Sequence, residues 1–422
     1  MPSHQPDLSV AESAFSVFDL LRVCRDLAWS EIAAMPGYRS RLGPRLPHSQ
    51  ASTWPDWSSG GLALDSLACM QLATSAAVWC NAQDTGFEDL FLTKRNAQGW
   101  ADAMQRARSA GARGFTFSTS GSTGRRQHIR HAYDSLMAEA HSWAQVLRAS
   151  ALPVRRIVTL VPCHHIYGFI WGVLVPKALD VPVVEVSHEA LPKLLAGDLL
   201  VGVPDQWQWL AGSVSAGATP VQGVTSTAPM SGPVHQRLIT AAGATPPMLA
   251  RLLQIYGSTE TGGIGWRDDP DAPYTLAPGR SCSAGGEVEL LLPGGALVPL
   301  ALEDEVRWTG ANQFELLRRT DNCVQVGGHN VSLAWVREQL LAYPAVEDAS
   351  VRLDTAAPLP RLKAFVVLKA PANQALQTGL QEWALENLPW YAALGSICYG
   401  AELPRNAMGK PSDWPVQNAT LL

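Results

Sequence analysis

The sequence predicts an α/β protein, with a large N-terminal domain of mostly parallel sheets covered by helices and a small α+β domain at the C-terminus. Continuous apolar runs of strand length occur at residues 155–162, 181–186, 198–204 and 219–227. Segments with helical spacing separate them, and buried apolar strands that alternate with helices are typical of parallel sheet covered on both faces. After about residue 285 this rhythm changes to hairpins and then to a compact α+β pattern.

The elements expected in the large domain follow one another in a regular order. Helical spacing precedes the first strand, and the later helices fall between strands. The expected helices span about residues 10–35, 62–82, 96–110, 132–149, 166–179 and 231–242. Ligands of such sheets bind at the carboxyl ends of the strands, and the loop at residues 118–124 is expected there.

The C-terminal part has a different pattern. GEVELLL (286–292) and FELLRR (314–319) are typical of hairpin strands. The sequence pattern from residue 321 predicts a compact unit of about 100 residues, which is long enough to form a separate domain. Its expected elements are a strand in NCVQVGG, helices at 332–342 and 373–387, and strands at 346–353, 362–369 and 396–401. The predicted domains are residues 1–320 and residues 321–422.

Composition restricts the class of function. Of 422 residues, 47% are hydrophobic and 16% charged, and the net charge of −5 argues against a nucleic acid partner. The N-terminus lacks the pattern of a signal peptide, and polar residues interrupt the apolar segment 62–79, which favours a buried helix over a membrane span. The seven scattered cysteines lack CxxC spacing, as expected of reduced thiols. We expect a cytoplasmic protein with neither nucleic acid nor membrane as partner; no oligomeric state is predicted.

The stretch GFTFSTSGSTGRRQHIRH (114–131) places hydroxyl residues, glycines and arginines directly after an apolar run. Such a loop can bind a polyphosphate through backbone N–H and hydroxyl groups, although a Ser/Gly segment also forms ordinary turns. The P-loop pattern GxxxxGK[ST] is excluded, because the glycine spacing differs and no lysine follows. The candidate phosphate-binding residues are Thr119, Ser120, Gly121, Ser122, Thr123 and Gly124.

Three further segments carry candidate functional side chains. In PCHHIYG a predicted strand ends just before His165, which is therefore placed to contact a ligand; two adjacent histidines do not predict a metal site. QIYGSTETG adds the carboxylate of Glu260, which suits Mg²⁺ shared with phosphate oxygens. LPRNAMGKP places Lys410 in a glycine-flanked loop. Each segment also has a structural interpretation: a histidine satisfied within the fold, a surface turn with a solvated Glu260, and a solvated lysine, which is the default for Lys410.

Taken in order, these segments resemble the adenylate-forming superfamily of acyl- and aryl-CoA synthetases, luciferases and peptide-synthetase adenylation domains. The resemblance depends on STSGSTG, PxxHxxG, YGSTETG, RRTDNCVQVGGHNV and PRNAMGK, and extends over about residues 90–415. It implies that a carboxylate attacks the α-phosphorus of ATP, that pyrophosphate leaves, and that a thiol then takes the acyl group. It also implies that the small domain is mobile and hinged at Asp321.

The resemblance implies particular nucleotide contacts. The loop at 118–124 would hold the β- and γ-phosphates of ATP, and Ala228 and Pro229 in STAPM would contact adenine. Tyr256 would stack on adenine, and Thr259 would reach the α-phosphate. The remaining nucleotide candidates are Gly257 and Ser258, with Asp304 and Arg319 at the ribose, and Glu260 as the Mg²⁺ ligand.

Other residues are assigned to the acid and the thiol. HHIYGF resembles the FHIY segment that lines the acyl pocket of 4-coumarate-type ligases, which favours a small aromatic acid with its ring near Tyr167. The acid-binding candidates are His165, Tyr167, Gly168, Ser258 and Gly262. The thiol channel is assigned to Gly327 and Gly328. The predicted catalytic residues are Lys410, which resembles the essential lysine of adenylation, and Glu260, Thr259 and His165.

The chain departs from the family pattern in three respects. Gln127 stands where the first loop usually has a lysine, with Arg125 and Arg126 as candidate replacements for its charge. The YRTGD motif of the family is degenerate in this chain, so Asp304 is a candidate for the ribose-binding carboxylate without a matching motif around it. The chain is also shorter than typical members, which we attribute to loss of N-terminal elements.

We therefore expect an ATP- and Mg²⁺-dependent ligase that activates an aryl acid, such as a hydroxybenzoate, as acyl-AMP. The expected acceptor is the phosphopantetheine thiol of a holo acyl carrier protein, because the chain loosely resembles the ligases that load hydroxybenzoate in aryl-polyene or xanthomonadin pigment pathways. Coenzyme A is the alternative acceptor. Two other functions stay open: a catalytically weak nucleotide-binding homologue, suggested by Gln127, and a ligase that passes the adenylate to an amine.

Overall fold

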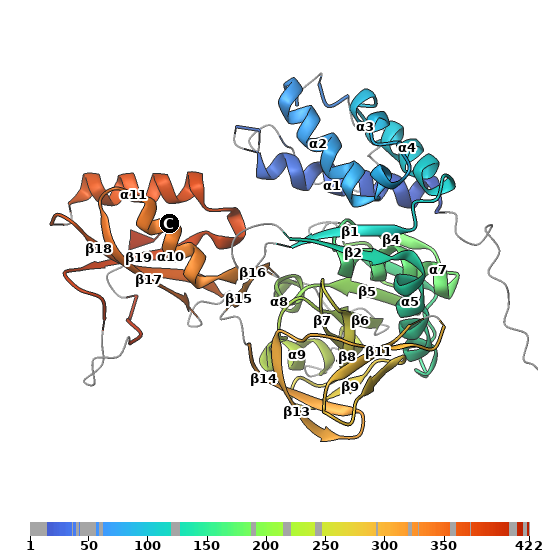
Figure 1. Cartoon of the computed structure of the whole chain (residues 1–422). Helices are drawn as coiled ribbons and strands as arrows, with labels where there is room; N and C mark the ends of the chain where they lie inside the picture. Colours follow the sequence, from blue (N-terminus) through green and yellow to red (C-terminus); the bar gives the residue numbers. More distant parts are fainter. Residues whose placement is uncertain are drawn as a thin grey trace, which may run out of the picture. The chain divides into compact units, whose positions relative to one another are not determined.

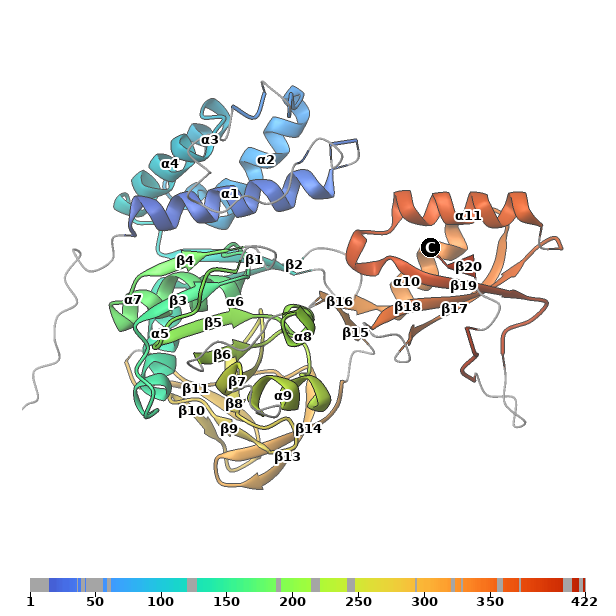
Figure 2. The ribbon, with the colours of Figure 1, turned by 180° about the vertical axis from the view of Figure 1, so that it is seen from behind.

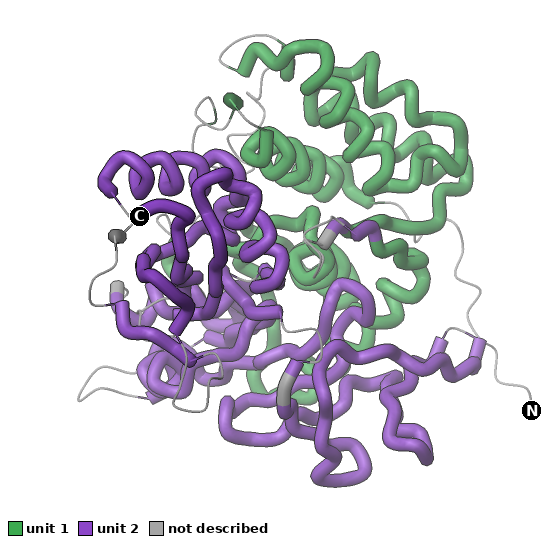
Figure 3. Tube along the Cα trace, turned by 60° about the vertical axis from the view of Figure 1, so that its left-hand side comes forward, with its two compact units in different colours: residues 1–117, 129–193 green, residues 118–128, 194–422 purple. Residues whose placement is uncertain are grey.

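The computed structural model forms two compact units, coloured separately in Figure 3. Unit 1 comprises residues 1–117 and 129–193, and unit 2 comprises residues 118–128 and 194–422. The structure describes residues 15–35, 37–38, 42, 56–58, 62–119, 127–186, 191–213, 221–240, 247–292, 294–319, 323–327, 329–354, 360–371, 373–404, 412–416 and 420–421.

Unit 1 begins with packed helices (Figure 1). They are α1 (Val17–Ala34), α2 (Ser66–Trp79), η4 (Ala82–Asp84), α3 (Asp89–Thr93) and α4 (Ala97–Ser109). Three of them start at a side chain that accepts a hydrogen bond from the first turn, namely Ser16, Asp65 and Asn96, as helix N-caps do. The prediction that segment 62–79 is a buried helix is only half right, because Leu67 is 74% exposed and Met70 54% exposed.

The rest of unit 1 alternates strands and helices. Its elements are β1 (Gly114–Thr119), β2 (Gln127–Ala132), α5 (Tyr133–Arg148), β3 (Arg156–Thr159), α6 (Ile166–Phe169), the π-helix η5 (Ile170–Leu174), α7 (Val175–Leu179) and β4 (Val183–Glu185). Strands β3 and β4 pair in parallel, and α5 packs on η5 and α7. Strands β1 and β2 form a two-stranded sheet, and residues 118–128 belong to unit 2.

Unit 2 contains a mixed sheet with the order β13-β14-β9-β8-β7-β6-β5 (Figure 2). Its elements are β5 (Asp198–Gly202), α8 (Pro204–Ser213), β6 (Val221–Thr225), α9 (Gly232–Ile239), β7 (Leu249–Ser258), β8 (Gly262–Arg267), β9 (Tyr274–Leu276), β13 (Asp304–Gly310) and β14 (Gln313–Arg319). Strands β5, β6 and β7 are parallel, and the others are antiparallel. The predicted α/β class is confirmed.

The two predicted hairpin strands lie in different sheets. GEVELLL contains β11 (Val288–Leu291), which pairs with β10 (Arg280–Cys282) and β12 (Leu297–Pro299). FELLRR belongs to β14, which pairs with β13 and β9. Both segments are therefore strands, but they do not pair with each other.

The C-terminal segment has a sheet and a core of its own. Its elements are β15 (Cys323–Val326), β16 (His329–Ser332), α10 (Leu333–Ala342), β17 (Val346–Asp354), β18 (Arg361–Leu368), α11 (Gln374–Asn387), η7 (Trp390–Ala392), β19 (Leu394–Gly400) and β20 (Thr420–Leu421). The sheet order is β17-β18-β19-β20. The boundary near residue 321 stays a prediction.

Two smaller predictions can be compared with the structure. In the described part of the chain, no helix has the length and apolar character needed to cross a membrane. The seven cysteines are free thiols, five of them buried, as the scattered spacing predicted.

Candidate active site

The turn predicted to contact adenine lies beside Tyr256. Strands β6 and β7 run in parallel with Thr225 opposite Gln254, so the residues that follow each strand leave the same edge of the sheet. The buried hydroxyl of Ser226 donates to the backbone oxygen of Ile255 over 3.0 Å and ties the two segments together. Thr227 has a φ of +78°, which turns the chain sharply into Ala228 and Pro229.

The ring of Tyr256 is held by aromatic neighbours and its hydroxyl by a carboxylate. Its centroid lies 5.7 Å from that of Tyr274 and 5.8 Å from that of Phe314. The hydroxyl donates to Oδ2 of Asp304 over 2.9 Å. Burial, and then the charge of Asp304, raise the pKa of Tyr256, so the phenol stays protonated and keeps donating.

Asp304 and Arg319 lie opposite each other where β13 begins and β14 ends. The guanidinium of Arg319 pairs with Oε2 of Glu303 over 2.6 Å. Tyr256, Asp304 and Arg319, which the sequence analysis assigned to one nucleotide, thus converge from three strands. Glu303 was missed, and the only signal for it was a second carboxylate beside Asp304 in LEDE.

The β7–β8 turn presents Thr259 and Glu260. A Cβ on Gly257 would lie 2.2 Å from the backbone oxygen of Gly262, and Gly262 has a φ of +66°, so the turn needs both glycines. The hydroxyls of Ser258 and Thr261 lie 3.1 Å apart, and each also accepts from the other's backbone N–H. The sequence analysis missed this bracing role of Thr261.

The donor set of this turn fits Mg²⁺ bound together with a nucleotide. No group of three or more metal-ligating side chains occurs within the residues that the structure describes. Mg²⁺ usually keeps several waters and binds through one or two carboxylates plus substrate phosphates. Glu260, half-buried on the braced turn, supplies such a carboxylate.

His165 lies at the start of helix α6 in unit 1. Its backbone oxygen accepts from the N–H of Phe169 over 2.8 Å, and its ring centroid lies 3.9 Å from that of His164. The indole of Trp79 donates to the backbone oxygen of His164 over 2.9 Å. A Cβ on Gly168 would lie 1.9 Å from the backbone oxygen of Pro162, so this glycine permits a close approach of the chain to itself.

Aromatic side chains pack around this helix. Phe169 contacts Trp79, Phe115 and Phe117, with centroid distances of 5.3, 4.8 and 5.7 Å. Tyr167 is half-buried, and burial raises the pKa of its phenol well above the usual value. Phe169, two residues after Tyr167, therefore lies in an aromatic cluster of unit 1.

Several predicted residues fall outside the described part of the chain. They are Ser120, Gly121, Ser122, Thr123, Gly124, Asp321, Gly328 and Lys410, together with the side chain of Thr119. At the base of the first loop, Oγ of Ser118 lies 3.1 Å from Nδ1 of His128. Gly327 has a φ of +55°, which explains the glycine there.

Comparison with known proteins finds a family and close relatives. A model of the family described as AMP-binding enzyme matches residues 81–312. The chain is 36% identical to a 4-coumarate–CoA ligase of Cereibacter sphaeroides, over 84% of this chain and 84% of that protein. It is 34% identical to a 4-coumarate–CoA ligase of Halorhodospira halophila, over 93% of this chain and 98% of that protein.

Solved structures support the fold. A malonyl-CoA ligase in complex with methylmalonyl-CoA and AMP has a TM-score of 0.55 at 20% identity, over 69% of this chain and 71% of that chain. An o-succinylbenzoate CoA synthetase from Bacillus subtilis has a TM-score of 0.53 at 18% identity, over 70% of this chain and 67% of that chain. At these identities the likeness concerns the fold alone.

Proposed function

The chain belongs to the family of AMP-binding enzymes, and from this premise we propose that it is an AMP-forming ligase of a carboxylic acid and a thiol. The observation that carries the proposal is the convergence of Tyr256, Asp304 and Arg319 beside the turn after β6. An aromatic face, a carboxylate and a guanidinium suit the base and the ribose of a nucleotide. The family match supports ATP as that nucleotide.

The first step joins two anions, so alignment and charge neutralisation dominate its barrier. A carboxylate oxygen attacks the α-phosphorus of ATP, a new P–O bond forms, and the bond to the departing pyrophosphate breaks. Thr259, on the braced turn, is proposed to hold the α-phosphate. Glu260 is proposed to hold Mg²⁺, which when bound would neutralise phosphate charge.

Lys410 supplies the remaining positive charge in this proposal. A compact ammonium on a flexible stem can bridge a carboxylate and a phosphate oxygen. The separate sheet and core of the C-terminal segment support a domain that could carry this lysine. Its hinge at Asp321 and the thiol channel at Gly327 and Gly328 are part of the same proposal.

The proposed acid is a hydroxylated aryl acid, with 4-coumarate as the first candidate. The names of the relatives support this class, and so does the aromatic cluster around Phe169, which lies on the same segment as His165 and Tyr167. The same names favour coenzyme A as the acceptor, so the acceptor first expected from the sequence, a carrier protein, takes second place. The likeness to ligases of pigment pathways stays a prediction.

The test is an acid screen in two stages. Pyrophosphate release is measured with ATP and Mg²⁺ over 4-coumarate, hydroxybenzoates and alkyl acids, and thioester formation is then measured with coenzyme A or holo carrier protein. We expect release with 4-coumarate and a thioester with coenzyme A. Adenylate without any thioester, but with an amide when an amine is added, would favour the amide-forming alternative. No release with any acid would favour the catalytically weak homologue.

A further inference from the structure

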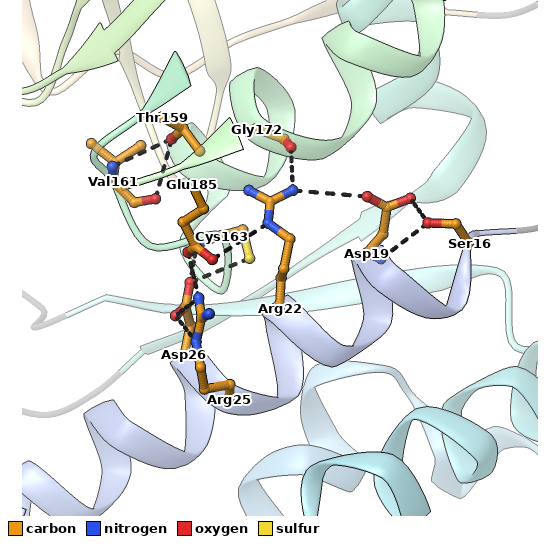
Figure 4. Close-up of polar contacts among 10 residues, drawn as sticks. All are labelled: Ser16, Asp19, Arg22, Arg25, Asp26, Thr159, Val161, Cys163, Gly172 and Glu185. Atoms are coloured by element: carbon orange, nitrogen blue, oxygen red, sulfur yellow. Dashed lines mark hydrogen bonds and ion pairs between the residues drawn. The ribbon is translucent and has the colours of Figure 1, made fainter. Parts of the chain in front are cut away.

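Helix α1 buries charged side chains in unit 1, among them Arg22, Arg25 and Asp26. Arg22 and Arg25 are 0% exposed and Asp26 is 1% exposed, and Glu185 at the end of β4 is 8% exposed. Figure 4 shows the polar contacts among these side chains. Burying charges is costly unless each is paired and hydrogen-bonded. The two guanidinium groups are paired here with the buried carboxylates of Asp26 and Glu185, and Arg22 also lies 3.8 Å from the partly exposed carboxylate of Asp19.

The two carboxylate oxygens of Asp26 accept hydrogen bonds from different partners, one from the guanidinium of Arg25 and the other from Cys163. Oδ1 accepts from Nε and Nη2 of Arg25 over 3.2 and 2.8 Å. Oδ2 accepts from the backbone N–H of Cys163 over 2.8 Å and faces its Sγ at 3.3 Å. Burial, and then the charge of Asp26, raise the pKa of Cys163, so the thiol stays protonated and can donate. Cys163 lies two residues before His165.

Arg22 holds the other end of the same segment. Its Nη1 donates over 2.8 Å to the backbone oxygen of Gly172, inside the π-helix η5. A π-helix shifts its internal hydrogen bonds by one residue, and such segments are frequent at functional sites. A Cβ on Gly172 would lie 3.3 Å from Nη2 of Arg22, so the contact is close.

Glu185 joins the two arginines. Its carboxylate pairs with Arg25, and its Oε2 lies 3.7 Å from Nε of Arg22. Burial works to lower the pKa of Arg25, but the charges of Asp26 and Glu185 raise it, so the guanidinium stays charged. The α1 brace, defined as Arg22, Arg25, Asp26 and Glu185, therefore contacts the segment 163–172 at both ends.

We propose that Asp26 is a positioning residue for the acid site, which acts through the α1 brace on the segment that carries His165 and Tyr167. The inference rests on the proposed function, because that function places the acid at these two residues. Direct contact with the acid is not involved, since the carboxylate of Asp26 is buried and used by Arg25 and Cys163. Loss of the contact lets the segment shift, and a misplacement of about 1 Å can cost about 100-fold in rate.

The experiment compares Asp26→Asn with a matched control, Glu139→Gln. Glu139 is also a buried carboxylate of unit 1, and it accepts from the indole of Trp143 over 3.1 Å. The ring of Trp143 packs on Trp171, which lies beyond the residues 163–169 that carry His165 and Tyr167. For Asp26→Asn we expect the KM for 4-coumarate in pyrophosphate release to rise about tenfold or more, with the KM for ATP unchanged. For Glu139→Gln we expect both KM values to stay as in the wild type, whatever the loss of thermal stability.

A second readout is independent of activity. Backbone hydrogen exchange of residues 163–169 should become faster in Asp26→Asn and not in Glu139→Gln. If Asp26→Asn does not fold, the same two measurements are made on Arg22→Lys. This variant keeps the positive charge but loses the several N–H donors of the guanidinium group. A folded variant with wild-type acid KM and wild-type exchange overturns the positioning role. If the wild-type enzyme releases no pyrophosphate with any acid, the proposed function is wrong. Hydrogen exchange of residues 163–169 then still tests whether the α1 brace holds this segment in place.

Discussion

Replacement of Tyr256 by Phe should weaken ATP binding while leaving the ring in place. The variant removes the hydroxyl that donates to Oδ2 of Asp304 over 2.9 Å. A hydrogen bond to a charged group contributes about 1.5–3 kcal/mol, and because Asp304 is half-buried and can regain water, we take the lower limit. A loss of about 1.4 kcal/mol is tenfold in an equilibrium constant. The hydrogen bond is made without ATP, so this free energy is the largest amount that the loss of a fixed Asp304 can take from ATP binding, and we expect the KM for ATP to rise by up to about tenfold.

The assay is pyrophosphate release at saturating 4-coumarate with ATP varied, and a urea titration measures the free energy of unfolding. The matched control is Tyr274→Phe, because Tyr274 belongs to the same aromatic cluster and its ring stacks on Phe314 at 5.6 Å. We expect the control to leave the KM for ATP unchanged. Equal KM values for ATP in the wild type and in Tyr256→Phe, or the same rise in the control, would refute the assignment of Asp304 to the nucleotide.

Three further predictions concern the metal, the lysine and the C-terminal unit. Glu260→Gln should raise the Mg²⁺ concentration needed for half-maximal pyrophosphate release, and unchanged Mg²⁺ dependence would remove Glu260 from the metal site. Lys410→Ala should abolish adenylate formation but largely spare thioester formation from pre-made adenylate; equal loss of both steps would contradict a hinged domain. Burial lowers the pKa of His329 from 6.5 to about 4. The folded state then binds fewer protons than the unfolded state between these values, so its stability is complete above about pH 6.5 and falls as the pH drops towards 4. The full loss of folding free energy is about 3 kcal/mol. Urea titrations at several pH values in this range should show that the free energy of unfolding falls more steeply with decreasing pH in the wild type than in His329→Gln.

The sequence by itself determined the α/β class and the positions of most helices, because apolar periodicity is a local property of the chain. The order of the motifs identified the family for the same reason. Strands β7, β8, β9 and β13 were not predicted. Strand β2 was not predicted, since its polar residues form no apolar run and its exposed face tolerates them. Helix α8 was also missed, because its start at Pro204 coincides with the end of an apolar strand.

Only the tertiary structure decided which side chains meet. Packing brings Asp304 to Tyr256 from strands that are not neighbours in the sheet, and no local pattern specifies that contact. The same holds for Asp26, whose partner Cys163 lies on a distant segment. Arg319 meets Glu303 across the β13–β14 hairpin, whose short turn sets the register. Buried polar groups must be paired, but the pairing is chosen by packing of the whole unit and not by spacing along the sequence.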